Sequence, residues 1–222
     1  MIELKNSKFT NVFFINDKIC TRNLNPGEKV YGETLTVIKE IEYRFWDPYR
    51  SKLAAMILNG CSILPITPKN NILYLGAGNG TTASHVSDIV TEGYVYCVEF
   101  SARAFKDLMS VASSRKNLLP ILENAFHPER YKSLVGNIDV IYQDISQRDQ
   151  ARVFITNSEQ FLKSGGYGIF MIKSRSIDIT KPPRIVFTDV VEQLRKSGFK
   201  IIDKIGLEPY SKDHLGVIVK II

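Results

Sequence analysis

A glycine-rich turn between a buried strand and a helix is the feature that most constrains the fold of this chain. Residues 72–75 are all apolar or aromatic, Gly76, Gly78 and Gly80 follow them, and residues 82–90 have the apolar spacing of a helix. In an open α/β sheet, ligands bind at the carboxyl ends of the strands, and glycines there let the backbone approach a ligand closely. The turn therefore predicts a cofactor site on an α/β sheet.

Strands and helices alternate along the rest of the chain. We expect further strands at 94–98, 138–142, 167–172, 199–205 and 217–222, and helices at 102–113, 150–162 and 185–197. This alternation is typical of a mostly parallel sheet covered on both faces. The last two strands have too short a connection for a crossover helix, so they should pair antiparallel. A seven-stranded, mostly parallel sheet with one antiparallel strand is the Rossmann-like fold of AdoMet-dependent methyltransferases.

The N-terminal part of the chain has short strands in place of this alternation. Residues 12–15 and 19–21 flank Asn16-Asp17, which predicts a hairpin turn, and residues 34–38 are rich in β-forming side chains. A sheet this small is barely stable alone, so it should pack against a larger unit. We expect a small β-rich N-terminal domain at 1–45 and a catalytic domain at 46–222.

The pattern changes at Asp47-Pro48. Aspartate is a favoured N-cap and proline a favoured first helical residue. Apolar residues then recur with helical spacing as far as Ile57. We therefore expect a helix that begins at Pro48 with Asp47 as its cap.

Charge and cysteine usage limit the class of protein. The formal net charge of +6 and the sequence pI of about 9.1 favour an anionic partner such as nucleic acid. Cys20, Cys61 and Cys97 lack metal-ligand spacing, so we expect reduced thiols and no metal site. The sequence contains no apolar run of about 20 residues and no signal-type N-terminus, which favours a cytoplasmic location.

The glycine spacing helps to identify the cofactor. The dinucleotide fingerprint GxGxxG requires glycine where this chain has Thr81, which disfavours a nicotinamide oxidoreductase. Residues 76–80 read GxGxG, which is closer to an AdoMet loop. Glu99 follows the next predicted strand, where an acidic side chain accepts hydrogen bonds from ribose hydroxyls. Phe100 is placed to stack on an adenine ring.

Five stretches resemble motifs of the fibrillarin family. They are YRFWDPYRSKLAA at 43–55, GTTASHVSD at 80–88, DVIYQDISQ at 139–147, KSRSID at 173–178 and PYSKDH at 209–214. Their order and spacing match over nearly the whole chain. Without the Gly/Arg-rich extension of the eukaryotic members, the chain resembles the archaeal fibrillarins. It departs from the family at Gly78-Asn79, usually Ala-Ser, and at Asn124-Ala125, where the family often has an aspartate.

The resemblance implies box C/D guide-RNA-directed ribose 2′-O-methylation of rRNA and tRNA, with S-adenosyl-L-methionine (AdoMet) as the methyl donor. The implied partners are guide and target RNA, a Nop-domain scaffold protein and a kink-turn-binding ribosomal-type protein. The predicted cofactor-binding residues are Gly76, Ala77, Gly78, Gly80, Thr81, Thr82, Glu99, Phe100, Asn124, Ala125, Asp144 and Gln147.

The resemblance also implies a catalytic set of Lys52, Asp144, Lys173 and His214. Lys173 closes a predicted strand and Asp144 follows another, so both should lie at the ligand edge of the sheet. Lys173 acts either as a base, with its pKa lowered by desolvation and by Lys52, or as a cation that stabilises the developing alkoxide. Asp144 would orient Lys173 through an ion pair. Lys52 and His214 would position the ribose or a phosphate.

Other polar and aromatic residues have simpler interpretations. His85 lies inside a predicted helix and should be structural, and Trp46 and Tyr43 should pack in the core in preference to stacking on a base. The sequence has no base-reading motif, so the isolated chain should bind RNA weakly or nonspecifically. Candidate phosphate contacts are Arg44, Arg50, Lys52, Arg175, Lys181 and Arg184.

Two alternative functions stay open at this point. One is a methyltransferase that acts on a protein glutamine or a small molecule. The other is a non-catalytic AdoMet-binding subunit that assembles an RNA-protein particle. Assays on RNA and on protein distinguish the first alternative, and single substitutions in the catalytic set distinguish the second.

Overall fold

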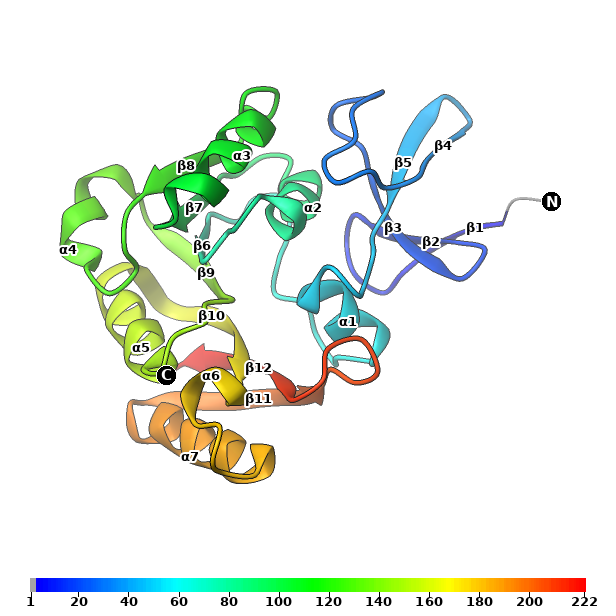
Figure 1. The fold of residues 1–222 in the computed structure, drawn as a ribbon. Helices are drawn as coiled ribbons and strands as arrows, with labels where there is room; N and C mark the ends of the chain where they lie inside the picture. The colour runs from blue at the N-terminus through cyan, green and yellow to red at the C-terminus, as the bar shows by residue number, and fades with distance from the viewer. Residues whose placement is uncertain (1–2) are drawn as a thin grey trace.

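The computed structural model describes residues 3–222, which form two β-sheets (Figure 1). The larger sheet has seven strands in the order β11-β12-β10-β9-β6-β7-β8. Their bounds are β6 Ile72–Leu75, β7 Val95–Glu99, β8 Leu118–Leu122, β9 Ile138–Gln143, β10 Leu162–Lys173, β11 Phe199–Gly206 and β12 His214–Ile221. Strands β6 to β10 pair in parallel, and β12 is antiparallel to both of its neighbours. This arrangement confirms the Rossmann-like methyltransferase fold predicted from the sequence.

Helices cover both faces of this sheet because successive strand residues point to opposite sides. On one side, Ile72 and Tyr74 of β6 belong to a core with α1, α2 and α3. On the other, Leu73 and Leu75 belong to a core with α4, α5 and α7. The helix bounds are α1 Lys52–Leu58, α2 Thr81–Ile89, α3 Ala102–Ala112, α4 Pro128–Tyr131, α5 Gln150–Phe161, α6 Ser174–Ile177 and α7 Pro183–Lys196, with a 3-10 turn η1 at Lys132–Leu134.

Strand β8 is the one strand of the larger sheet that the sequence analysis did not predict. Its central residue is Pro120, which has no backbone N–H to donate. Proline is tolerated in a strand only at a sheet edge or a bulge. Since β8 pairs with β7 alone, it is an edge strand, and the sheet accommodates the proline there.

The smaller sheet is antiparallel, with the order β1-β2-β3-β5-β4. Its bounds are β1 Leu4–Asn6, β2 Val12–Ile15, β3 Lys18–Arg22, β4 Leu35–Ile38 and β5 Ile41–Phe45. The predicted hairpin is confirmed, because Asn16 and Asp17 connect β2 to β3 with φ of 48° and 61°. Figure 1 shows this sheet beside α1 and α2. The division into domains 1–45 and 46–222 stays a prediction.

Helix α1 begins later than the sequence indicates. The predicted start at Asp47-Pro48 is wrong, because residues 48–50 form a turn and the cap is Ser51, whose side chain accepts from Ala54 N. Asp47 instead accepts a hydrogen bond from Tyr49 N at 2.9 Å, the short-range turn contact that aspartate favours. As a consequence, Lys52 is the first helical residue.

A buried ionic network joins the small sheet to α2. Arg44 of β5 is 0% exposed, and its guanidinium pairs with Glu33 and with Asp88 of α2 (Nη1–Oδ2 3.1 Å). Arg115 Nη1 lies 2.6 Å from the other oxygen of Asp88. Arg44 therefore cannot contact a phosphate, and its assignment to the RNA surface is wrong. A purely charge-based interpretation missed its two acidic partners.

The other interpretations of this region are confirmed. His85 is buried, its Nδ1 lies 2.7 Å from Thr21 Oγ1 and its Nε2 lies 2.8 Å from the hydroxyl of Tyr31. Burial, reinforced by Arg44 and Arg115, holds the pKa of His85 well below its usual value. Trp46 and Tyr43 are core residues, 2% and 4% exposed.

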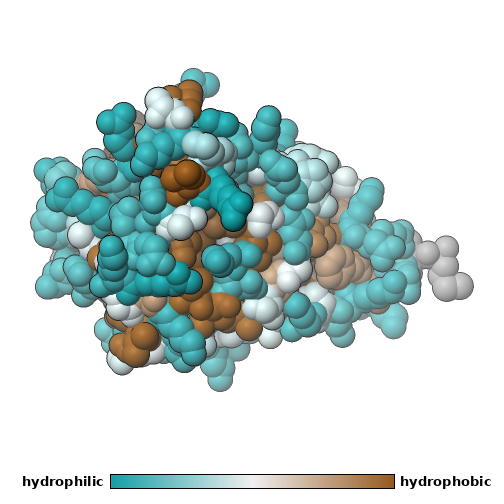
Figure 2. All heavy atoms as spheres, turned by 90° about the horizontal axis from the view of Figure 1, so that it is seen from below, coloured by the Kyte–Doolittle hydropathy of each residue, from teal (hydrophilic) through white to brown (hydrophobic). Residues whose placement is uncertain are grey.

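The surface and the thiols also bear on the expectations from composition. Hydrophilic side chains cover most of the face seen in Figure 2, and apolar ones are exposed in separate groups. The three cysteines are free and buried. Within residues 3–222, no helix has the length and apolar character needed to cross a bilayer. The cytoplasmic location stays a prediction.

Candidate active site

The glycine-rich loop between β6 and α2 has a backbone that only glycine adopts readily. Gly76, Gly78 and Gly80 have φ of 80°, 56° and 87°. A Cβ on Gly76 would lie 2.9 Å from the carbonyl oxygen of Asp144 and 2.8 Å from Ile145 Cγ2. The loop thus packs directly against the segment that follows β9, and this close approach places Asp144 beside the loop.

Glu99, at the end of β7, is hydrogen-bonded to the glycine-rich loop, and this contact fixes the position of its side chain. Its Oε2 accepts from Gly78 N and its Oε1 from Ser101 N, both at 2.8 Å. The side chain is nearly buried, with the residue 7% exposed. A carboxylate has about four acceptor sites, so Glu99 keeps lone pairs for ligand hydroxyls. Its fixed position fits the ribose-binding role predicted for it.

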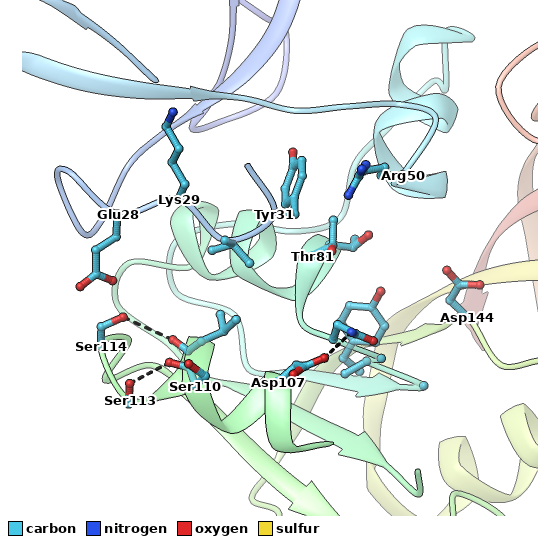
Figure 3. Close-up of a pocket in the computed structure, with 18 residues that line it drawn as sticks. Glu28, Lys29, Tyr31, Arg50, Thr81, Asp107, Ser110, Ser113, Ser114 and Asp144 are labelled. Atoms are coloured by element: carbon cyan, nitrogen blue, oxygen red, sulfur yellow. Dashed lines mark hydrogen bonds between the residues drawn. The ribbon is translucent and has the colours of Figure 1, made fainter. Parts of the chain in front are cut away.

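Two cavities flank this loop and share Gly76, Gly78 and Asp144 in their walls. The smaller has a volume of about 300 Å³. The predicted cofactor-binding residues that line this smaller cavity are Gly76, Gly78, Glu99, Phe100, Asn124, Ala125, Asp144 and Gln147. The larger, of about 1150 Å³, is shown in Figure 3. The predicted cofactor-binding residues that line the larger cavity are Gly76, Ala77, Gly78, Thr81, Thr82 and Asp144.

Gly80 is the predicted cofactor residue that lines neither of these cavities. It is the N-cap of α2, and a Cβ there would meet the side chains of Leu108 and Val111 of α3 at 3.2 and 3.3 Å. Its observed contacts are therefore with α3, and its contact with the cofactor stays a prediction.

The four predicted catalytic residues come from the ends of four elements. Lys52 opens α1, Asp144 follows β9, Lys173 closes β10 and His214 opens β12. Asp144 Oδ1 lies 2.8 Å from Lys173 Nζ and 3.2 Å from Lys52 Nζ. Lys173 and His214 are opposite one another across β10 and β12. One carboxylate thus joins two ammonium groups, which leaves a net positive charge to face a developing anion.

Lys173 Nζ is surrounded by oxygen acceptors. It donates to the carbonyl oxygen of Asp144 at 3.0 Å and to Ser146 Oγ at 2.9 Å, and Asp144 Oδ1 is its third neighbour. The negative charge of Asp144 at 2.8 Å favours the protonated, ammonium form of Lys173. Burial lowers the pKa of Lys173 below 10.5, with Lys52 adding to the effect and Asp144 opposing it.

His214 has a defined neutral tautomer. Its Nδ1 lies 2.6 Å from the carbonyl oxygen of Lys212, which only accepts, so Nδ1 carries the hydrogen and Nε2 is left as the acceptor. Burial lowers the pKa of His214 below 6.5, and the charges of Lys52 and Lys173 also favour the neutral form. His214 is therefore a neutral imidazole at pH 7.

Three residues that the sequence analysis did not single out hold this cluster in place. Gln150, fully buried at the start of α5, accepts from Lys173 N at 3.0 Å and donates to Lys173 O at 3.2 Å. Ser51 accepts a hydrogen bond from Thr82 Oγ1 at 3.0 Å, which links the start of α1 to the start of α2. Ser146 lies within the recognised motif at 139–147, but no pattern in the sequence indicates the backbone contacts of Gln150.

The remaining candidate phosphate contacts lie at the surface. Arg50, Arg175, Lys181 and Arg184 are exposed. Arg175 Nε pairs with Asp213 at 2.9 Å, next to His214, and Lys181 Nζ with Asp189 at 3.3 Å. Their positions permit RNA contact, which stays a prediction.

Comparisons with known proteins agree over nearly the whole chain. A family model described as Fibrillarin matches residues 4–222. A fibrillarin-like rRNA/tRNA 2′-O-methyltransferase of Methanothermobacter thermautotrophicus is 53% identical over 209 residues, which is 94% of this chain and 93% of the relative.

Solved structures of similar chains include one of Aeropyrum pernix fibrillarin with natively bound S-adenosyl-L-methionine. It is 40% identical, covers 99% of this chain and 100% of its own, and has a TM-score of 0.91. A structure of a fibrillarin/Nop5p complex also has a TM-score of 0.91 and 40% identity, covering 98% of this chain and 100% of its own.

Proposed function

Because the chain belongs to the fibrillarin family, we propose that it transfers a methyl group from AdoMet to a ribose 2′-hydroxyl of RNA. The observation that carries this proposal is the ion-paired group of Lys52, Asp144 and Lys173 at the carboxyl edge of the sheet, beside the glycine-rich loop. Ligand sites in open α/β sheets lie at this edge. The chain is accordingly an AdoMet-dependent RNA 2′-O-methyltransferase.

The residues around the loop fit AdoMet. At Gly78, a Cβ would meet nothing within 4 Å, so the backbone is open on the cavity side. Glu99 suits the ribose hydroxyls, and the N-terminus of α2 at Thr81 and Thr82 offers backbone N–H groups to a carboxylate. Phe100, which is exposed at the wall of the smaller cavity, suits the adenine ring. When bound, AdoMet supplies a methyl group activated by its sulfonium charge.

We assign two roles to different residues: Lys173 stabilises the negative charge of the alkoxide, and His214 accepts the proton of the 2′-hydroxyl. The contacts of Lys173 Nζ favour an ammonium that stabilises the alkoxide electrostatically, while Asp144 fixes the positions of Lys173 and Lys52. The Nε2 atom of His214 is the acceptor for the hydroxyl proton, since it is unprotonated in the tautomer set by Lys212. A general base of this kind contributes about 10²–10⁴ in rate.

The partners belong to the same proposal. A similar fibrillarin forms a complex with Nop5p, and we extend this to a Nop-domain scaffold protein for this chain. A box C/D guide RNA and a kink-turn-binding ribosomal-type protein complete the particle. Guide RNA would supply the sequence information, because the exposed cations Arg50, Arg175, Lys181 and Arg184 contact phosphates without reading bases.

Reconstitution with these partners tests the proposal. Tritiated AdoMet is supplied with guide RNA and target RNA, and the 2′-O-methyl mark is mapped along the target. Methylation of the guided nucleotide supports the proposal. Label on protein alone supports a protein methyltransferase, and AdoMet binding without transfer to either substrate supports a non-catalytic assembly subunit.

A further inference from the structure

A sharp turn precedes His214 at the start of β12. Asp213 has a φ of 59°, in the left-handed region that few residues other than glycine adopt. Across this bend, Nδ1 of the His214 ring lies 2.6 Å from the carbonyl oxygen of Lys212, two residues earlier. The backbone conformation of Asp213 is therefore linked to the orientation and the tautomer of His214.

The backbone of this turn is held by the end of the neighbouring strand. Lys173 and His214 are opposite one another across β10 and β12. Ser174, the residue after Lys173, is 0% exposed and donates twice to the carbonyl oxygen of Asp213, from N at 3.3 Å and from Oγ at 2.9 Å. The start of α6 thus lies against the turn (Figure 1), which is fixed to the same strand end that carries Lys173.

The side chain of Asp213 is held by Arg175. Its Oδ2 lies 2.9 Å from Arg175 Nε, and Arg175 Nη1 donates to the carbonyl oxygen of Ile179 at 3.2 Å. One guanidinium therefore joins the turn before His214 to the connection between α6 and α7. The two side chains are 49% and 19% exposed, and ion pairs at the surface contribute little to overall stability. We expect this pair to affect local geometry more than folding.

The charges that act most on His214 come from other elements. They belong to Lys52 at the start of α1, Asp144 after β9 and Lys173 at the end of β10. Arg175 and Asp213 carry opposite charges in direct contact, so together they add little net charge near the ring. An effect of this pair on His214 is therefore expected to pass through the turn.

We propose that Arg175 and Asp213 are positioning residues for His214, and that their ion pair holds the turn that aims Nε2 at the 2′-hydroxyl of the target ribose. A general base acts only within hydrogen-bond reach of the proton that it accepts, at about 2.6–3.2 Å. A displacement of the ring of about 1 Å is enough to lose much of the rate. The inference rests on the proposed function, since it takes His214 as the proton acceptor.

This role differs from the phosphate contact predicted for Arg175 from the sequence. A phosphate contact adds to RNA affinity, and its contribution weakens as the salt concentration rises. Positioning of the base changes the rate of methyl transfer and leaves RNA affinity unchanged. Variants of Arg175 therefore separate the two roles, because one acts on binding and the other on the chemical step.

The experiment uses the particle assembled with guide RNA, scaffold protein and kink-turn-binding protein. Single-turnover rates of 2′-O-methylation and the Kd for target RNA are measured as functions of pH and salt. The variants are Arg175→Ala, Asp213→Gly and the two combined, and Arg175→Ala is also made in a His214→Gln background. Glycine adopts a left-handed φ freely, so Asp213→Gly removes the ion pair without backbone strain. The matched control is Arg195→Ala, which removes a 50% exposed arginine from a surface pair with Glu192 on α7.

In Arg175→Ala and Asp213→Gly we expect the single-turnover rate at pH 7 to fall about tenfold, which is part of the roughly 10²–10⁴-fold contribution of a general base. Affinity for RNA and for AdoMet, and the Tm, should stay near wild type. The combined variant should be no slower than the slower single variant, because both changes remove the same pair. Asp213→Asn keeps an oxygen acceptor and tolerates a left-handed φ, so it should recover most of the rate.

The acidic limb of the pH–rate profile shows how the pair acts. The hydrogen bond from Nδ1 to Lys212 O raises the pKa of His214, because it stabilises the protonated ring. If the pair acts through the turn, both variants weaken this bond, and the limb moves to lower pH in both. If the pair acts through its charges, loss of Arg175 raises the pKa and loss of Asp213 lowers it, so the limbs move in opposite directions.

Three outcomes would overturn the inference. They are acidic limbs that shift in opposite directions, a further loss of rate from Arg175→Ala when residue 214 is already glutamine, and an effect of Arg175→Ala that is confined to the Kd for RNA and its salt dependence. Failure of the proposed function is distinguishable. Wild type and Arg195→Ala would then place no methyl mark on the guided nucleotide, and a wild-type rate in His214→Gln would refute His214 as the acceptor.

Discussion

Lys173 Nζ lies 2.8 Å from Asp144 Oδ1, although Lys173 is the last residue of β10 and Asp144 follows the end of β9. Strands β9 and β10 are parallel neighbours in the sheet, so their carboxyl ends meet at one edge. The register sets the distance between the two side chains, and Gln150 fixes both backbone polar groups of Lys173. The ion pair is thus built into the sheet and its adjoining helix.

The division of roles between His214 and Lys173 predicts the pH dependence of methylation. A proton acceptor works only when unprotonated, and the pKa of His214 is lowered from 6.5 by burial and by the neighbouring lysines. The rate should therefore be flat from about pH 7 upward and fall as pH drops below the lowered pKa. The measurement is kcat/KM for the assembled particle as a function of pH.

The same pH profile tests the alternative that Lys173, and not His214, accepts the proton of the 2′-hydroxyl. If Lys173 were the acceptor, the rate would instead rise with pH through the pKa of Lys173, which burial lowers from 10.5. Such a rise would contradict our assignment. His214→Gln should remove the acidic limb together with most of the rate.

Gln150 should act as a positioning residue. Substitution by alanine removes both hydrogen bonds to the backbone of Lys173 and the one to Gln147 O at 2.9 Å. We expect kcat to fall about tenfold and the free energy of unfolding to fall by about 1–3 kcal/mol, because buried partners lose their hydrogen bonds. Gln193→Ala, on the exposed face of α7, is the control. An unchanged kcat in a destabilised Gln150→Ala would mean that Gln150 is only structural.

Arg44 should be a major stabilising residue of the small sheet. Arg44→Met leaves the carboxylates of Glu33 and Asp88 without this buried partner. Removing one partner from a buried ionic group costs about 3–5 kcal/mol. Urea unfolding should show this loss, whereas Arg195→Ala, which breaks an exposed pair with Glu192, should change stability by less than about 1 kcal/mol. A small change in Arg44→Met would refute the structural role of the network.

Two alanine substitutions in the glycine-rich loop should have different effects. In Gly76→Ala the Cβ clashes with backbone at Asp144 and the φ is left-handed, so both folding stability and AdoMet binding should be lost. In Gly78→Ala the Cβ meets nothing, so only strain of about 1 kcal/mol is expected in the fold. AdoMet affinity should nevertheless fall, because the methyl group projects toward the ligand. Calorimetry of AdoMet binding and thermal unfolding measure the two effects, and equal behaviour of the variants would contradict this account.

Much of the site could be predicted because it follows from strand ends. The pattern at 72–82 predicts a ligand loop, and Asp144 and Lys173 were expected at the same edge because parallel strands end together. The order of elements predicted six of the seven strands of the larger sheet, and β8, with Pro120 at its centre, was the one not located.

The features that escaped prediction depend on contacts distant in sequence. Arg44 has the charge of an RNA contact, and only its buried partners Glu33 and Asp88 exclude that role. Asp47 and Ser51 are both favourable N-cap residues for α1. Ser51 is the cap because it accepts from Ala54 N, whereas Asp47 accepts from Tyr49 N in the preceding turn. The contact of Tyr49 with Tyr210 joins segments at opposite ends of the catalytic unit, which no local pattern indicates.

The most direct test of the central claim is guided methylation by Lys173→Ala. The claim is that the Lys173–Asp144 pair faces the ribose that accepts the methyl group. In the assembled particle, Lys173→Ala should lower the rate of 2′-O-methylation at the guided nucleotide about 10²–10³-fold, the usual cost of losing one preorganised electrostatic group, with AdoMet affinity unchanged. Lys196→Ala, in the last turn of α7, should methylate like wild type. A near-wild-type rate in Lys173→Ala would contradict the account.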